Sequence, residues 1–574
     1  ATAQDPLDER GVRRLLCLLD QAGDRSGALQ AYEDFARRLR DELQAEPAAE
    51  TRALADALRA ERPAAASPAS PPAPASPVPS FPSSSPNPPA VRGGTGSPAP
   101  AASIAVLPFV DMSPEPQAYF ADGLTEELIS ALALIEGMQV TSRTSSFAFK
   151  DRAQPLRAVA AELGVATVLE GSVRCMEGRV RVVAQLIDAA TDTHLWTDAF
   201  ERPLRDVLAI QSQVAEQISR ALRVELSPAA RGRMDARPTG NARAFDLYLQ
   251  GRHWWSQGSR EAWPRAVECY RQAIEEDARF ALAYCGLADL YLHTSLLPFN
   301  PPVPRAEALE KGRVAALRAL ELNEELGEAH AALGVARWYA WDWEGSERAF
   351  RRAVVLNPGY ATAHQRWSVC LCAQGRWDEA LREVRRAQEL DPLSLGVAVD
   401  RALIDLRARR YALAIAQLER VLAVDPCFAP ALHFLTEAYA YSGDLPMAAR
   451  MWQRRGRVTA ERVAELDALL ERRDMEAYAR AWACEAERNG AAPGVLAGTL
   501  SRTGSLERAW EQIERALEER DPVLADGARL HPGFDVLRQD PRWQDVLRRI
   551  GITDPPPVPP PLALPYPGWE PAPG

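Results

Sequence analysis

The 574-residue sequence predicts a mostly α-helical protein: an α-solenoid of helical hairpins, one α/β domain and a short N-terminal helical module. Three observations lead to this fold class. Asn-Pro and Asp-Pro pairs recur every 34 residues in the second half, residues 103–226 mix strand and helix patterns, and residues 63–101 consist mainly of Pro, Ala, Ser and Gly. The length also indicates several domains, because single cores stop growing beyond about 300 residues.

The chain begins with amphipathic helical patterns, and residues 7–40 read as one helical hairpin. The Pro- and Ala-rich stretch cannot bury enough apolar surface to offset the entropy lost on ordering, so we expect an extended spacer there. These composition shifts predict six parts: a helical module at 1–62, a linker at 63–101, an α/β domain at 102–228, helical repeats at 241–462, degenerate capping repeats at 463–553 and a Pro-rich tail at 554–574.

The α/β domain is predicted from short apolar runs that alternate with helical patterns. The runs expected to be extended are 103–110, 138–142, 146–149, 165–175, 180–188 and 194–200. The runs expected to be helical are 124–135, 156–163 and 207–226. Glu177-Gly178 indicates a hairpin turn and Gly164 a helix end, whereas residues 227–241 fit neither pattern.

Three proline-containing pairs are spaced by 34 residues: Asn357-Pro358, Asp391-Pro392 and Asp425-Pro426. Each follows an amphipathic helix, and Asn323 falls one period upstream. The residue before a proline is pushed out of the α region, so each pair should end a helix. The period is that of a helix–turn–helix solenoid, in which small residues such as Ala380 and Ala387 let paired helices approach closely.

The register is interrupted once, near the start of the repeats. After a first hairpin at about 247–280, the next register position comes 46 residues on, twelve more than one period. We place this surplus, which includes 297–302, in the turn inside the second hairpin. Four to five hairpins are predicted in this way, and the register blurs beyond Thr459.

Bulk properties exclude several classes of protein. A net charge of −11 gives no global attraction for nucleic acid or anionic membranes. The eight cysteines are scattered without a CxxC pair, which favours a reduced, cytoplasmic setting. No apolar run is long enough to span a membrane, and no nucleophile elbow, Walker A, GxGxxG or HExxH motif occurs. We therefore expect no enzymatic activity, no cofactor and no metal.

An acidic cluster at Asp122, Glu126 and Glu127 has two interpretations. Carboxylates grouped in this way can hold a metal or do acid–base chemistry. Carboxylates in a first helical turn also cap the helix and complement its dipole. We favour capping, with Asp122 as the N-cap.

Paired cysteines and histidines in the repeats read as packing. Cys370 and Cys372 lie about 200° apart on one helix, so they cannot share a metal. His330 and His364 are separated by one 34-residue period, which is repeat register and not ligand spacing.

Aromatic residues gather where a first helix of a hairpin meets its turn: Trp338, Tyr339, Trp341 and Trp343. Such a cluster is usually the interface between hairpins, and less often an anchor for a bound peptide. Trp254-Trp255 is a weaker case of the same kind. First helices line the concave face of such a solenoid, which gives these candidate protein-binding residues: Trp338, Gln365, Cys372, His433 and Glu437.

Three segments resemble known families. Residues 5–58 resemble the bacterial transcriptional activator domain through the DPLDE opening, Ala22-Gly23-Asp24, Tyr32 and the Glu46-Pro47 ending. Residues 103–226 resemble the TolB amino-terminal-like domain through SIAVLPF, YFADGLTEELISAL, ELGVATVLEGSVR and VLAIQSQVAEQI. Residues 244–460 resemble tetratricopeptide (TPR) repeats.

The order of these segments implies a soluble bacterial transcriptional regulator, or a fragment of one, that takes part in signal transduction and binds partner proteins or peptides through its repeats. In SARP-type regulators the activator domain follows a winged helix, so DNA would be bound only through such a domain, which this sequence does not contain. Two alternatives stay open: a TPR scaffold that does not bind DNA, and the regulatory tail of a nucleotide-cyclase-type signalling protein. A homo-oligomer is compatible with the sequence.

Overall fold

The computed structural model describes most of the chain from Ala102 to Ile552, and a few positions between Val12 and Ala55. The short gaps within the larger part are 116–117, 153, 177, 204–207, 236–237, 258, 260, 296–302, 457, 473 and 503. The predicted linker, the proposed turn at 297–302 and the tail 554–574 therefore lie outside the described residues. Contacts divide the chain into two units, Ala1–Ala90 and Val91–Gly574.

The first unit is described by a small apolar cluster. Its buried side chains are Val12, Leu16, Tyr32, Phe35 and Ala55. The described positions around Val12 and Phe35 are helical, as the sequence predicts. Most of the predicted hairpin at 7–40 lies outside the described residues.

The α/β domain is built on a mixed sheet with the order β3-β1-β4-β5-β6, in which β2 also pairs with β4. The strands are β1 (Ser103–Val106), β2 (Val110–Asp111), β3 (Gln139–Val140), β4 (Thr167–Met176), β5 (Arg179–Asp188) and β6 (Thr193–Pro203). β1 is parallel to β3 and β4, whereas β4, β5 and β6 are antiparallel. Alternate residues face opposite sides, so Ile104 packs in the core with α4 and α7 while Ala105 packs with α6.

The helices of this domain are α4 (Ala118–Ala133), α5 (Arg143–Phe147), α6 (Leu156–Leu163), α7 (Leu208–Ala221) and α8 (Pro228–Asp235). The helix end at Gly164, with φ +68°, and the hairpin at Gly178, with φ +74°, are confirmed. The extended run predicted at 146–149 is wrong, because α5 covers its start and the serines of α5 are buried.

Two further expectations about local structure are wrong. Asp122 is not an N-cap, because the buried Phe120 and Ala121 extend the apolar face and α4 begins at Ala118. Residues 227–241 contain α8, which buries only the small side chain of Ala230 and so has no apolar period for a pattern search to find.

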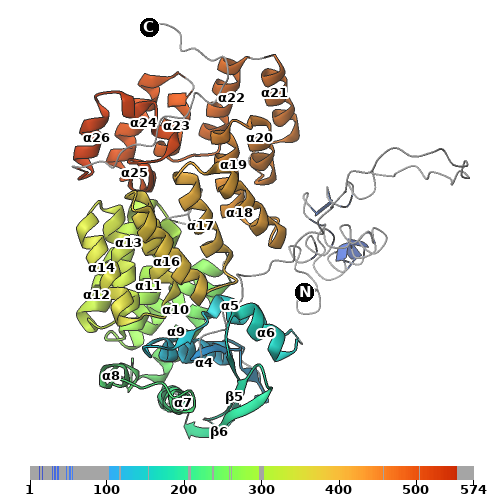
Figure 1. Cartoon of the computed structure of the whole chain (residues 1–574), viewed down its shortest axis with the longest axis vertical. Coiled ribbons are helices and arrows are strands. Elements are labelled where there is room, and N and C mark those ends of the chain that lie inside the picture. The colour runs from blue at the N-terminus through green and yellow to red at the C-terminus, as the bar shows by residue number, and fades with distance from the viewer. Residues whose placement is uncertain are drawn as a thin grey trace, which may run out of the picture. The chain divides into compact units, whose positions relative to one another are not determined.

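The rest of the second unit is a stack of helix pairs (Figure 1). Six pairs occupy the predicted repeats: α9 (Ala242–Ser256) with α10 (Ala262–Glu276), α11 (Ala281–Ser295) with α12 (Arg305–Leu322), α13 (Gly327–Tyr339) with α14 (Trp343–Leu356), α15 (Ala361–Ala373) with α16 (Trp377–Leu390), α17 (Leu395–Arg407) with α18 (Tyr411–Val424), and α19 (Ala429–Ser442) with α20 (Leu445–Arg454). The fold class is therefore mostly α with TPR-like hairpins and one small mixed sheet.

A C-terminal part follows the six pairs. Its elements are α21 (Ala460–Glu471), α22 (Met475–Arg488), α23 (Pro493–Arg502), α24 (Leu506–Glu518), α25 (Pro522–Gly527), the 3₁₀ turns η2 (Pro532–Phe534) and η3 (Leu537–Gln539), and α26 (Trp543–Arg549). Thr459 caps α21 through a hydrogen bond from the Arg462 amide. A helix therefore begins at the residue beyond which the 34-residue period is no longer clear in the sequence.

The periodic Asn and Asp residues end equivalent helices. Asn357, Asp391 and Asp425 are the C-caps of α14, α16 and α18, each extended with φ between −129° and −138°. Each donates its amide to the carbonyl four residues earlier, at Ala353, Ala387 or Val421. Asn323 does the same at the end of α12. The prediction that each of the proline-containing pairs ends a helix is confirmed.

A second position also repeats every 34 residues, in the turns inside the third to sixth hairpins. Trp341, Gly375, Arg409 and Gly443 all have a left-handed backbone, with φ between +63° and +93°. Glycine adopts this conformation freely, whereas other residues are strained in it. We therefore expect Trp341 and Arg409 to make contacts that offset the strain of this backbone conformation.

Candidate functional site

One cavity of about 940 Å³ lies against the first helices of the hairpins, and we call it the repeat cavity. All five residues predicted to bind a partner line it: Trp338 from α13, Gln365 and Cys372 from α15, and His433 and Glu437 from α19. Their convergence follows from the repeat register, which places first helices on one side. The structure thus brings the predicted residues together, but whether they bind a protein stays a prediction.

The opposite wall of the repeat cavity comes from the C-terminal part. Tyr478, Trp482, Arg502, Asp526 and His531 contribute to it from α22 onward. Figure 1 shows α25 beside α13, and it contacts both α13 and α15. We expected these helices to be degenerate capping repeats, and no pattern in the sequence indicates that they fold back.

Long-range contacts hold this fold-back in place. The Trp343 indole donates a 2.8 Å hydrogen bond to the carbonyl of Ile550. Arg409 forms a two-pronged ion pair with Asp535, at 2.6 and 2.7 Å, with both side chains about one-tenth exposed. Trp341 packs on the C-terminal core. The two strained turn residues, Trp341 and Arg409, are thus the ones that contact the C-terminal part.

The aromatic cluster around the α13–α14 turn consists of two pairs of residues with different surroundings. Trp338 and Tyr339 stack with ring centroids 4.8 Å apart and line the repeat cavity. Trp341 and Trp343 instead pack on the C-terminal core. The cluster is therefore largely buried interface, which is the interpretation that sequence reasoning favoured.

The lining of the repeat cavity carries more positive than negative side chains. Six arginines and four carboxylates contribute to it, although the chain as a whole has a net charge of −11. Among the described residues, Arg366, Arg454 and Arg502 have no carboxylate within 4 Å. Arg366 contacts His293 at 3.1 Å, Arg454 donates to the Pro426 carbonyl, and Arg502 donates to the Ala440 carbonyl and stacks over Tyr441.

One buried ion pair organises the middle of this lining. Arg407 donates to Glu437 at 3.0 Å, with 7% and 16% of their side chains exposed. Burial opposes the charged form of Glu437, but the Arg407 guanidinium and His531 hold its pKa well below the usual range. Burial lowers the pKa of His433 to about 3 and of His531 to about 4, so both imidazoles are neutral at neutral pH.

Polar atoms of the lining that lack a hydrogen-bond partner include the Trp338 indole nitrogen and Asp526 Oδ1. Burial, opposed by the Arg407 charge but reinforced by the Asp521 and Asp400 carboxylates, raises the pKa of Asp526 to about 7. Burial also raises the pKa of the Cys372 thiol to about 12, so it stays protonated and poorly nucleophilic. An occupant with polar groups could satisfy these unpaired atoms.

The acidic cluster of the α/β domain is engaged in ion pairs. Asp122 accepts two hydrogen bonds from Lys150, at 2.6 and 2.8 Å. Glu126 pairs with Arg143 at 3.2 Å and with Arg252 of α9, which joins this domain to the first hairpin. The capping interpretation is wrong for Asp122. Within the residues that the structure describes, no group of three His, Cys, Asp or Glu could hold a metal.

The paired residues of the repeats occupy equivalent places. His330 and His364 each contact a backbone carbonyl six residues earlier, at Glu324 and Pro358, which confirms their interpretation as repeat register. Cys370 contacts Ser346 at 3.7 Å, whereas Cys372 lines the repeat cavity. Trp254-Trp255 lies outside the cavity lining, with Trp254 under Arg265 and Trp255 against His293.

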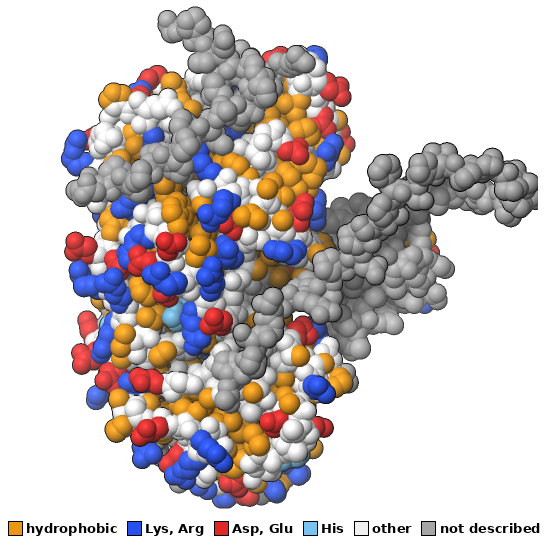
Figure 2. Space-filling model, viewed as in Figure 1, with side chains coloured by type: hydrophobic (Ala, Val, Ile, Leu, Met, Phe, Trp, Pro, Cys, Tyr) orange, Lys and Arg blue, Asp and Glu red, His pale blue; other side chains and the backbone are white. Residues whose placement is uncertain are grey.

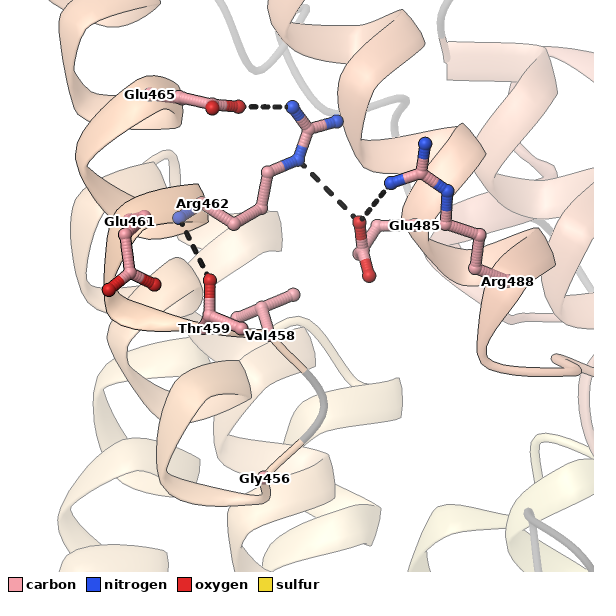
Figure 3. A pocket seen from close by; sticks show the side chains of 8 residues that line it. All are labelled: Gly456, Val458, Thr459, Glu461, Arg462, Glu465, Glu485 and Arg488. Carbon is pink, nitrogen blue, oxygen red and sulfur yellow. Dashed lines mark hydrogen bonds and ion pairs between the residues drawn. The ribbon is translucent and has the colours of Figure 1, made fainter. Parts of the chain in front are cut away.

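A smaller, polar pocket of about 530 Å³ lies between α21 and α22 (Figure 3). Its charges pair with one another: Arg462 with Glu465 at 2.6 Å and Glu485 at 3.6 Å, and Arg488 with Glu485 at 3.3 Å. None of the predicted binding residues lines it. With its arginines already paired, it is the weaker candidate.

The N-terminal segment has a clear relative among known domains. Residues 1–59 match the bacterial transcriptional activator domain. This match agrees with the resemblance seen at 5–58. The TolB-like resemblance of the α/β domain remains a prediction.

Comparison with curated proteins gives a relative of a different kind. The chain is 36% identical over 235 residues to a putative adenylate cyclase 3 of Rhizobium meliloti (strain 1021). The aligned part covers 41% of this chain and 40% of the relative, so the two share less than half of either length.

Two solved structures with some likeness to the chain are described as TPR proteins. YrrB, a TPR protein with an unusual peptide-binding site, is 20% identical, and the match covers 36% of this chain and 97% of YrrB with a TM-score of 0.23. A thermophilic TPR protein of Thermus thermophilus is 16% identical over 34% of this chain and 98% of its own, with a TM-score of 0.29. At such scores, the repeats are identified by their own register and helix pairs.

Surface properties add two observations. Every helix in the described residues is too short or too polar to cross a membrane. On the face shown in Figure 2, acidic and basic side chains are interspersed among apolar ones, without a broad area of one sign.

Proposed function

We propose that this chain is a regulatory protein without enzymatic activity, whose repeat cavity binds a segment of a partner protein. The observation that carries the proposal is the convergence of residues from α13, α15 and α19 on one cavity with a second wall. Eight aromatic side chains and three arginines without carboxylate partners offer both apolar contact and hydrogen bonds to an extended peptide. The protonated Cys372 thiol and the neutral histidines favour binding over covalent chemistry.

The process we propose is control of transcription in the bacterial cytoplasm. It is supported by the activator-domain match at residues 1–59 and by the seven described cysteines, all of which are free. The TolB-like α/β domain would transmit the state of the repeats, since α4 packs on α9 and Glu126 pairs with Arg252. DNA would be contacted through a winged-helix domain.

A second candidate is a regulatory block of the kind attached to nucleotide cyclases. The likeness to a putative adenylate cyclase favours it. The activator-domain match favours transcription instead. A scaffold without a transcriptional role is the third candidate, and binding of a partner through the cavity is common to all three.

The test is capture of partners from a bacterial extract by the full chain and two charge-reversed variants. Arg366→Glu changes a half-buried cavity residue that has no ion pair, whereas Arg352→Glu is a matched change at an exposed position of α14, outside the cavity. We expect a protein that binds the wild type and Arg352→Glu equally, and Arg366→Glu at least tenfold less. Equal capture by all three would contradict the proposal. Trp338 is unsuitable for this test, because truncating so buried a side chain costs about 3–5 kcal/mol of stability.

A further inference from the structure

We propose that the Pro-rich tail of this chain occupies the repeat cavity, at the place where a partner segment would bind. The tail, residues 554–574, has ten prolines among 21 residues, interspersed with Leu562, Leu564, Tyr566 and Trp569. The inference rests on the proposed function only in taking the repeat cavity as a peptide site. It does not need a partner to exist, and its test contains none.

The chemistry of the two surfaces fits. Pro-rich segments favour the polyproline II conformation, which docks in aromatic-lined grooves with little loss of entropy. The cavity lining includes eight aromatic residues, among them Phe434, Trp452 and Trp482. Tyr566 and Trp569 are three residues apart, which is one turn of this conformation, so both can face the same wall.

The residues that precede the tail contact the start of α14, next to the turn that follows α13. The tail's last described neighbour, Ile552, follows Ile550, whose carbonyl is bonded to Trp343. Trp343 is the first residue of α14 and follows the α13–α14 turn. In this turn the Trp341 amide donates a hydrogen bond to the carbonyl of Trp338, a residue that lines the cavity. At about 3.1 Å per residue, residues 553–569 can extend roughly 50 Å.

The other Pro-rich segment is the weaker occupant. Residues 63–101 contain mainly Ala, Ser and Gly between their prolines, with Phe81 as the one aromatic residue. Apolar anchors provide most of the binding free energy in such contacts, and the tail carries more of them. The linker is therefore the natural control.

The test measures access to Cys427, an exposed cysteine that lines the cavity. The full chain and its Tyr566→Ala/Trp569→Ala variant are treated with a bulky maleimide, and alkylation of each cysteine is followed by mass spectrometry. We expect Cys427 to react at least threefold faster in the variant, while Cys175 of β4 reacts equally in both. A synthetic peptide of residues 554–574 should restore the slow rate.

Two results would overturn the inference: equal rates at Cys427 in wild type and variant, or the same acceleration in Phe81→Ala, which would assign the site to the linker. A general loosening of the fold would accelerate Cys175 as well, and would also count against it. Partner capture and alkylation of Cys427 are separate measurements. Failure to capture a partner would therefore not change the conclusion drawn from alkylation, and equal alkylation rates would not change the conclusion drawn from capture.

Discussion

At the scale of single residues, the Arg407–Glu437 pair is a buried ion pair in the wall of the repeat cavity. Glu437→Gln would leave a guanidinium that is 7% exposed without its carboxylate. We expect the free energy of unfolding in urea to fall by about 3–5 kcal/mol, as is usual when one partner of a buried pair is removed. Glu321→Gln is the matched control. Its pair with Arg318 is exposed, so the loss should stay below about 1 kcal/mol. Similar losses of unfolding free energy in both variants would mean that the Arg407–Glu437 pair is hydrated.

Asp526 gives a pH dependence opposite to that of an ordinary carboxylate. Its pKa is raised from the ordinary value of 3.8 to about 7, so the folded state holds an extra proton between these values. Stability from this group is therefore present at low pH and is lost as the pH rises through 7.

Asp526→Asn should accordingly gain stability relative to the wild type between pH 5 and pH 8. We expect the difference in unfolding free energy to shift by at least about 1 kcal/mol, the equivalent of one pKa unit. The buried histidines titrate in both proteins, so the comparison isolates Asp526. The exposed Asp378→Asn should show no shift, and a constant difference for Asp526→Asn would refute the raised pKa.

At the scale of elements, α5 joins the α/β domain to the fourth hairpin. Ser145 donates to Asp391 at 2.6 Å and accepts from the Leu393 amide at 2.8 Å, while the Ser142 amide donates to the Leu390 carbonyl. Asp391 is also the C-cap of α16. One residue therefore ends a helix of the repeats and bonds to the α/β domain.

Ser145→Ala should weaken this joint, because it leaves the buried Asp391 carboxylate with fewer donors. We expect a loss of about 1–3 kcal/mol and faster hydrogen exchange in α5, measured by mass spectrometry. Ser256→Ala, at an exposed serine with a local bond only, should change neither. Unchanged exchange in α5 would show that Ser145 does not hold the joint.

Elements whose cause is local were predictable from sequence. Asn357 and its equivalents end helices because of the proline that follows, so a period in the sequence becomes a period in the structure. The first-helix wall of the cavity follows from the same register. In contrast, α5 depends on contacts with Asp391 about 250 residues away, and the second wall depends on Trp343 meeting Ile550. Contacts at such separations leave no pattern in a single sequence.

At the scale of the whole second unit, Asp535 holds the fold-back by pairing with both Arg409 and Arg538. Asp535→Asn removes the charge and leaves two largely buried guanidinium groups without a counter-ion. We expect several-fold faster proteolysis within residues 493–552 than in the wild type, measured under native conditions. Asp545→Asn, which affects a carboxylate about half exposed, should behave like the wild type. Equal cleavage of all three would mean that other contacts suffice.

The contact of α25 with α13 and α15 also fixes how many hairpins the array can hold. Open arrays can gain or lose a repeat, since each unit touches only its neighbours. Here α25, near the C-terminal end, contacts helices of the third and fourth pairs, so contacts are not confined to units that are neighbours in the sequence. Inserting or deleting 34 residues between α15 and α25 would displace the closing helices by a full unit, so variation in repeat number should be confined to the pairs that precede α13.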